Sequence, residues 1–130
     1  MATFLTLGMP RPDGYRPLLA GLLVEHSDLP VELSADAGSS PASDALAFLV
    51  HSGRGFAASA EDGDGVLRVL AATVAALRGD DVRAAWSAPD VAWVAAVPDP
   101  AAEALREVLL HVVVPDPGRV AAELAELGLR

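Results

Sequence analysis

The sequence predicts a single α+β domain, in which helices pack on a small sheet. Three observations predict this class: the chain has 130 residues, 52% of them are hydrophobic, and its segments alternate between helical and strand-like periodicity. A chain of this length buries about two-thirds of its unfolded surface, which is enough for one core. Cysteine is absent, so the core forms without disulfides and the chain has no thiolate chemistry.

The N-terminal third reads as strand, helix and strand. Residues 4–7 are a short strand candidate, closed by a cluster of Gly and Pro. A helix is predicted from Tyr15, because Pro17 suits a first helical turn and a leucine stripe follows it up to Pro30. That stripe consists of Leu18, Leu19, Leu22 and Leu23. Residues 31–35 alternate apolar and polar side chains, as a half-buried strand does.

The middle of the chain repeats this alternation. A short helix is predicted over residues 43–51, with Ser43 as its cap, and a strand over residues 55–61. The apolar spacing of residues 66–78 predicts a long helix. Asp62 and Asp64 precede it and are interpreted as helix-cap acids rather than as a calcium loop, since a late carboxylate ligand is missing.

The C-terminal part is predicted to contain one more strand, over residues 91–97, and two helices that open with Asp-Pro pairs at Asp99 and Asp116. The first of these helices is expected to run past His111, with one solvated and one buried face. Trp86 and Trp93 are interpreted as anchors of this half.

Charge excludes some classes of partner. Nine arginines, no lysine and eighteen acidic residues give a net charge of −9, and the arginines are scattered along the chain, so nucleic acid is not an expected partner. The apolar runs are far shorter than the roughly 20 residues that span a bilayer, and the start of the chain lacks a signal-like segment, so we expect a cytoplasmic protein without membrane contact. The residue usage is typical of a high-GC bacterium.

No motif for catalysis, metal binding or cofactor binding is present. The three histidines, His26, His51 and His111, have no second histidine at ligand spacing. Glu103 and Glu107 lie one helical turn apart, which suits either an acid–base pair or, more commonly, a solvated helix face. We therefore expect no catalytic residue, no metal and no cofactor.

The order of elements in residues 1–79 resembles HPr, the histidine-containing phosphocarrier of the sugar phosphotransferase system. Three segments carry the resemblance: Gly14-Tyr15-Arg16-Pro17, Val31-Glu32-Leu33-Ser34 and Ala58-Ser59-Ala60-Glu61. The resemblance implies an open-faced sandwich, a small mainly antiparallel sheet with helices packed on one face. Residues 80–130 would then be a C-terminal strand and helix extension packed on that core, within one domain of residues 1–130.

The resemblance also implies where a site would lie. The family carries its phosphorylated histidine at the start of the first helix, and here Gly14 stands at that position with Tyr15 beside it. Neither residue replaces an imidazole nucleophile. Gly14, Tyr15 and Arg16 would remain as an anion-binding site at a helix N-terminus, and Ser43 is the nearest equivalent of the family's regulatory serine.

We therefore expect a non-catalytic protein-interaction or regulatory module, related to a phosphocarrier that has lost its histidine, which binds a protein partner or forms a homodimer. Three alternatives stay open. The first is a small enzyme or ligand-binding protein with a site between the core and the extension, lined by Tyr15, Arg16, Glu103, Glu107 or His111. The others are a phosphocarrier that uses a non-standard residue and a roadblock-like regulatory domain.

Overall fold

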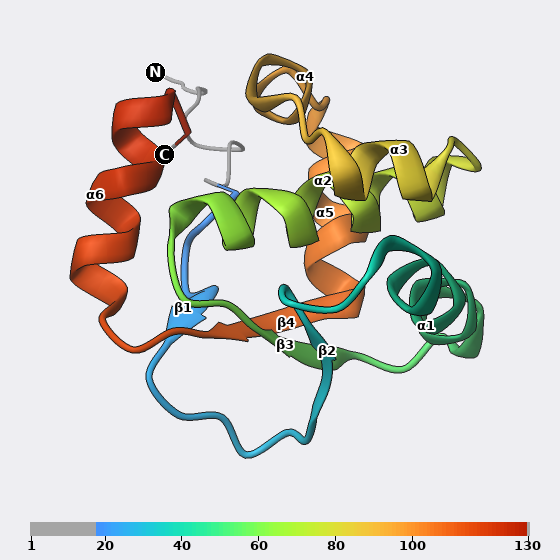
Figure 1. The fold of residues 1–130 in the computed structure, drawn as a ribbon, viewed down its shortest axis with the longest axis horizontal. Helices are drawn as coiled ribbons and strands as arrows, with labels where there is room; N and C mark the ends of the chain where they lie inside the picture. Colours follow the sequence, from blue (N-terminus) through green and yellow to red (C-terminus); the bar gives the residue numbers. More distant parts are fainter. Residues whose placement is uncertain (1–17, 130) are drawn as a thin grey trace, which may run out of the picture.

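The computed structural model describes residues 18–129, which form four strands and six helices (Figure 1). The strands are β1 (Leu23–Val24), β2 (Val31–Ser34), β3 (Phe56–Ser59) and β4 (Leu109–Val113). The helices are α1 (Ser39–Ser52), α2 (Gly63–Arg78), α3 (Val82–Ser87), α4 (Val91–Ala95), α5 (Asp99–Val108) and α6 (Pro117–Leu127). The strands form one sheet in the order β1-β4-β3-β2, and every neighbouring pair is parallel.

The expectation of a mainly antiparallel, HPr-like sandwich is therefore wrong for the described residues. β2 and β3 are joined through α1, and β3 and β4 through α2 to α5. A helical crossover returns the chain to the end of the sheet at which the preceding strand began. The two strands that it joins therefore run parallel. The strand expected at residues 4–7 lies outside the described residues.

β4 occupies a segment that was expected to be helical. The helix that starts at Asp99 ends at Val108, and the next five residues form a strand between β3 and β1. An inner strand of a parallel sheet is buried on both sides, so its sequence is an almost continuous apolar run rather than an alternating one. Such a run fits a helical pattern equally well. Part of the segment expected as an extension thus lies inside the sheet.

The helix expected from Tyr15 through the leucine stripe does not form in residues 18–23. Gly21 has a φ of 70°, a left-handed conformation that ends helical geometry. The carbonyl groups of Leu18 and Ala20 accept hydrogen bonds from Arg106 of α5 instead of from helical N–H groups (3.0 and 2.6 Å). Residues 18–22 are turns, and Leu23 then enters β1.

Two further boundaries differ from the sequence prediction. α1 begins at Ser39, not at Ser43, because Pro41 fits within a first helical turn, where its missing N–H group is no loss. Residues 91–97 are not a strand: Asp90 caps α4 by accepting hydrogen bonds from the N–H groups of Ala92 and Trp93 (3.0 and 3.2 Å).

Other elements are confirmed. β2 and β3 lie within the two strands predicted at residues 31–35 and 55–61. The long helix is α2, and its cap is Asp62, whose side chain accepts from the N–H of Gly65 at 2.9 Å. The final helix begins where the second Asp-Pro pair predicted, with Asp116 as its cap.

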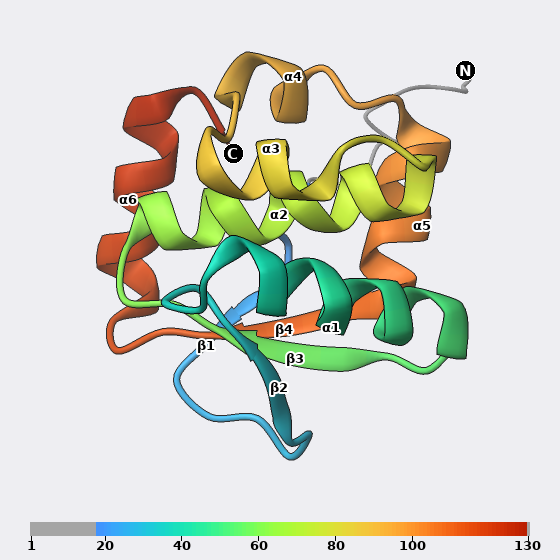
Figure 2. The same ribbon diagram turned by 45° about the vertical axis from the view of Figure 1, so that its right-hand side comes forward.

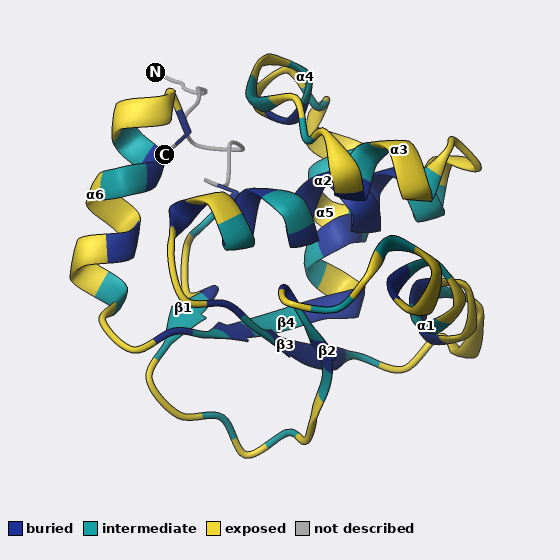
Figure 3. Ribbon diagram, in the orientation of Figure 1, coloured by how far each residue is buried: buried dark blue, intermediate teal, exposed yellow. Residues whose placement is uncertain are grey.

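The helices cover one face of the sheet, whereas the connection from β1 to β2, residues 25–30, crosses the opposite face (Figures 1 and 2). The chain moves across the sheet in one direction from β2 to β4 and in the other direction from β1 to β2. Right-handed crossovers in opposite directions lie on opposite faces, which accounts for this arrangement. The core lies on the helical side, around α2, most of whose residues are buried (Figure 3).

Candidate functional site

The structure describes only some of the site residues expected from the sequence. Gly14, Tyr15 and Arg16 lie outside the described residues. Ser43 is half-buried inside α1 rather than at its N-terminus. Glu103 is exposed on α5, whereas His111 lies in the middle of β4.

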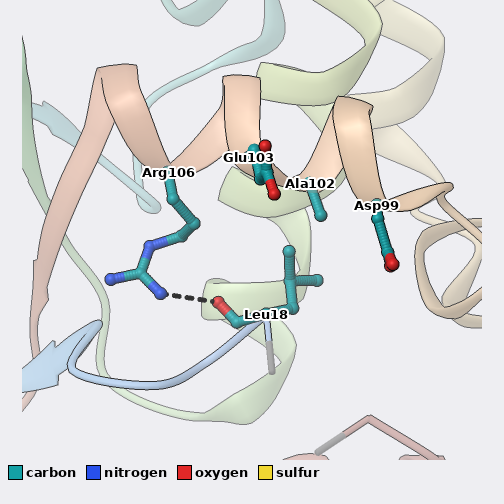
Figure 4. Close-up of a pocket in the computed structure, with 5 residues that line it drawn as sticks. All are labelled: Leu18, Asp99, Ala102, Glu103 and Arg106. Atoms are coloured by element: carbon teal, nitrogen blue, oxygen red, sulfur yellow. Dashed lines mark hydrogen bonds between the residues drawn. The ribbon is translucent and has the colours of Figure 1, made fainter. Parts of the chain in front are cut away.

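Figure 4 shows the junction between α5 and the start of the described chain. The cavity there is lined by Leu18, Asp99, Ala102, Glu103 and Arg106 and has a volume of about 10 Å³. That is room for about one water molecule. Arg106 donates to two backbone carbonyl groups of the facing segment, so the junction joins α5 to residues 18–20 and offers no space for a substrate.

A serine and a histidine meet on the sheet face that carries no helix. His111 pairs in register with Ala57, and the neighbouring Phe56 and Ala58 belong to the core, so the alternation of a strand turns Ala57 and His111 to the opposite face. The Ser27 hydroxyl lies 2.8 Å from Nδ1 of His111 and accepts from the N–H of Leu29 at 3.1 Å.

This pair resembles part of a nucleophile–base arrangement, but no third member contacts the histidine within residues 18–129. In a catalytic triad an acid orients the histidine. Within residues 18–129 the only hydrogen bond of the His111 ring is the one with the Ser27 hydroxyl. The contact therefore holds the loop of residues 25–30 against the sheet.

Acidic side chains gather at the N-terminus of α2, where they serve the helix itself. Glu123 of α6 accepts a hydrogen bond from the N–H of Gly63 at 2.8 Å and pairs with Arg119 at 2.9 Å. The positive end of the helix is thus occupied by carboxylates of the chain. In the described part of the chain, no group of three or more histidine or acidic side chains is arranged to hold a metal ion.

A much larger space lies among α2, α3 and α4, where these helices border an open groove with a volume of about 370 Å³. We call it the α2–α4 groove; its lining consists of five alanines, three aspartates and one tryptophan. These are Ala71, Ala75, Ala84, Ala85, Ala88, Asp80, Asp81, Asp90 and Trp93. Figure 2 shows the three helices that form it, with α3 along α2 and α4 beyond α3.

The alanines of the groove are the reason for its space. Ala71 and Ala75 of α2 lie at the base of the groove and are only 0% and 1% exposed. Ala84, in α3, and Ala88, the C-cap of α3, are exposed along one side. Because an alanine side chain ends at Cβ, the facing helices leave a gap that larger side chains would fill. The accessible apolar surface of the groove therefore comes from the exposed alanines of α3 and its C-cap and from Trp93.

One side of the groove holds a cation against an indole ring. Trp93 of α4 is half-buried, and the guanidinium carbon of Arg78 lies 5.8 Å from its ring centroid. Arg78 also pairs with Asp80, with its Nε 3.5 Å from the carboxylate Oδ2. Asp81 and Asp90 cap α3 and α4, and each uses Oδ1 to do so. The second oxygen of each of these exposed carboxylates makes no hydrogen bond within residues 18–129.

The two tryptophans differ in role. Trp86 is 2% exposed, its indole N–H donates to the carbonyl group of Ala37 at 2.9 Å, and Arg68 lies 5.7 Å from its ring centroid. It is the anchor that the sequence predicted. Trp93 also packs against the core, as an anchor does, and in addition it lines the groove, which the sequence did not predict. The available signal was the alanine-rich sequence around two Asp-capped short helices, whose spatial arrangement is not readable from spacing.

Comparison of the chain with protein-family models, with curated proteins and with solved structures gave no match in any of the three. None of the helices in residues 18–129 has the length and apolar character needed to cross a membrane.

Proposed function

We propose that this chain is a non-catalytic protein-interaction module that holds a segment of a partner protein in the α2–α4 groove. The observation that carries the proposal is the groove itself, about 370 Å³ in volume and lined by small apolar side chains, an indole ring and carboxylates. Binding clefts in proteins have volumes of about 300–1,000 Å³ and similar mixtures of apolar surface with a few polar groups.

The lining favours binding over chemical conversion. Within residues 18–129 the lining of the groove contains no serine, threonine, histidine, lysine or tyrosine, so its only ionisable side chains are the three aspartates. Asp81 and Asp90 are held in place as helix caps. An enzyme site requires reactive groups set against one another, whereas this groove supplies contact area and negative charge.

A partner segment with small apolar side chains and positive charge fits this surface. The groove carries three aspartates, and the whole chain has a net charge of −9. Charge complementarity of this kind accelerates encounter with a basic partner and disfavours an acidic one.

The test uses peptides selected from a random-sequence display library against the full chain. Ala84→Gln places a longer side chain in the groove without a helix-breaking residue, and Ala121→Gln makes the same change at an exposed site on α6. We expect the selected peptides to shift amide signals of Ala84, Ala88 and Trp93, with affinity lost several-fold in Ala84→Gln and retained in Ala121→Gln.

Two results would overturn the proposal. Equal affinity in the wild type and in Ala84→Gln would show that the groove is not the contact site. A wild-type dimer that Ala84→Gln dissociates would show that the groove is filled by a second copy of the chain instead of by a partner.

A further inference from the structure

We propose that the partner segment is anchored by an arginine placed against Trp93, and that Arg78 of this chain is the competitor which that arginine displaces. The inference rests on the proposed function, because it names the chemistry of the segment that the α2–α4 groove holds. It concerns three side chains that line or border the groove: Arg78, Asp80 and Trp93.

The contacts of Arg78 show what this end of the groove binds. Its guanidinium lies over the indole ring, 5.8 Å from the centroid, and its Nε lies 3.5 Å from the Asp80 carboxylate. An aromatic face beside a carboxylate is the environment that suits a planar guanidinium better than a compact ammonium ion. The chain thus fills its own cation position from the last residue of α2.

This internal contact is weak enough to be exchanged. The side chains of Arg78 and Asp80 are 48% and 52% exposed, and ion pairs between exposed side chains contribute little to stability. Moving Arg78 into solvent leaves α2 intact, since the helix ends there on Gly79, whose N–H bonds to the carbonyl groups of Ala75 and Ala76.

An incoming arginine gains more than Arg78 does. It meets the same ring and carboxylate, and in addition Asp90, which caps α4 three residues before Trp93 and uses only Oδ1 in its hydrogen bonds within residues 18–129. Its neighbouring side chains bury apolar surface against the alanines of the groove, which Arg78 cannot do from the helix end.

The experiment titrates the full chain with the capped peptide Ala-Ala-Arg-Leu-Ala and with analogues that carry lysine or glutamine in place of the arginine. The readouts are the indole N–H signal of Trp93 and the dissociation constant. We expect the arginine peptide to bind most tightly, the lysine peptide less tightly and the neutral glutamine peptide least.

Three variants separate the roles. Arg78→Met removes the competitor and keeps a long side chain, so it should tighten binding of the arginine peptide by about two- to five-fold. Asp90→Asn keeps the helix cap but removes its charge and should weaken binding by a similar factor. Arg54→Met removes another exposed arginine, which pairs with Glu32 at 3.4 Å, and should leave binding unchanged.

If Arg78→Met binds the arginine peptide as tightly as the wild type or more weakly, Arg78 does not compete with the peptide arginine for Trp93. Equal binding of the arginine and glutamine peptides in the groove would overturn the arginine anchor while leaving the groove as a binding site. Absence of any shift at Ala84, Ala88 and Trp93 with all three peptides would overturn the anchor as well, and the display selection then decides separately whether the groove binds other segments.

Discussion

Removal of residues 80–130 is expected to unfold the protein, because β4 is an inner strand of the sheet. The removed segment contains eight buried apolar side chains from α5 to the C-terminus: Leu105, Val108, Leu109, Val112, Val114, Val120, Leu124 and Leu129. Burial of each is worth about 1.5–3 kcal/mol, whereas whole domains are stable by only about 5–15 kcal/mol. The fragment 1–79 would also leave the inner edge of β3 unpaired.

The assay for this fragment is circular dichroism with thermal and urea unfolding, supported by the dispersion of its amide NMR spectrum. We expect no cooperative transition and a collapsed spectrum. A soluble fragment 1–79 that unfolds cooperatively would refute the reasoning, since it would show that β2 and β3 form a stable sheet without β4.

A matched pair of point variants tests the same reasoning in the full chain. Leu109→Ala, in β4, removes a side chain that is 0% exposed and should cost about 2–5 kcal/mol of unfolding free energy. Leu127→Ala, where the leucine is 40% exposed, should cost less than about 1 kcal/mol. Urea unfolding gives both values, and equal costs would contradict the placement of β4.

Three more variants probe single contacts, each by urea unfolding. Asp62→Ala removes the cap of α2 and should cost about 0.5–2 kcal/mol, whereas Asp62→Asn should cost little; equal losses would argue against capping. Arg106→Met removes two charge-assisted hydrogen bonds and should lower the unfolding free energy by about 1–3 kcal/mol. The amide NMR signals of Leu18 and Ala20 should also shift, and unchanged signals would contradict the contact. Ser27→Ala should cost about 1 kcal/mol and change the His111 ring signals, and unchanged ring signals would speak against the pair.

Local signals made part of the fold predictable. α2 combines a helical apolar period with an aspartate cap, and both act within a few residues of each other. Asp116 and Pro117 gave the start of α6 in the same way. β2 was predicted because it lies at the edge of the sheet, where apolar and polar side chains alternate.

The wrong secondary-structure predictions fall where contacts between residues far apart in the sequence determine the structure. Residues 18–22 are not helical, because Gly21 breaks the turn and Arg106, far along the chain, bonds the carbonyl groups that a helix would use. β4 and a buried helix have the same apolar composition, and only its position between β3 and β1 makes it a strand. Strand direction followed from a family resemblance and not from the residues.

The groove could not be predicted from the sequence for a related reason. Ala71 and Ala84 belong to different helices, and nothing in their spacing indicates that they border one space. Trp93 lies three residues after the capping Asp90. The aspartate indicates where the helix begins, but it does not indicate what the indole ring faces. Binding sites built from small side chains leave no motif, because their main feature is the volume that they do not fill.

The most direct test of the proposed interaction is a paramagnetic relaxation measurement with the arginine peptide carrying a nitroxide label at its C-terminus. We expect the amide signals of Ala84, Ala88 and Trp93 to broaden, while those of Ala57 and His111 on the helix-free face of the sheet remain sharp. Broadening at Ala57 and His111 with sharp signals in the α2–α4 groove would contradict the proposed interaction and place the partner on the opposite face of the protein.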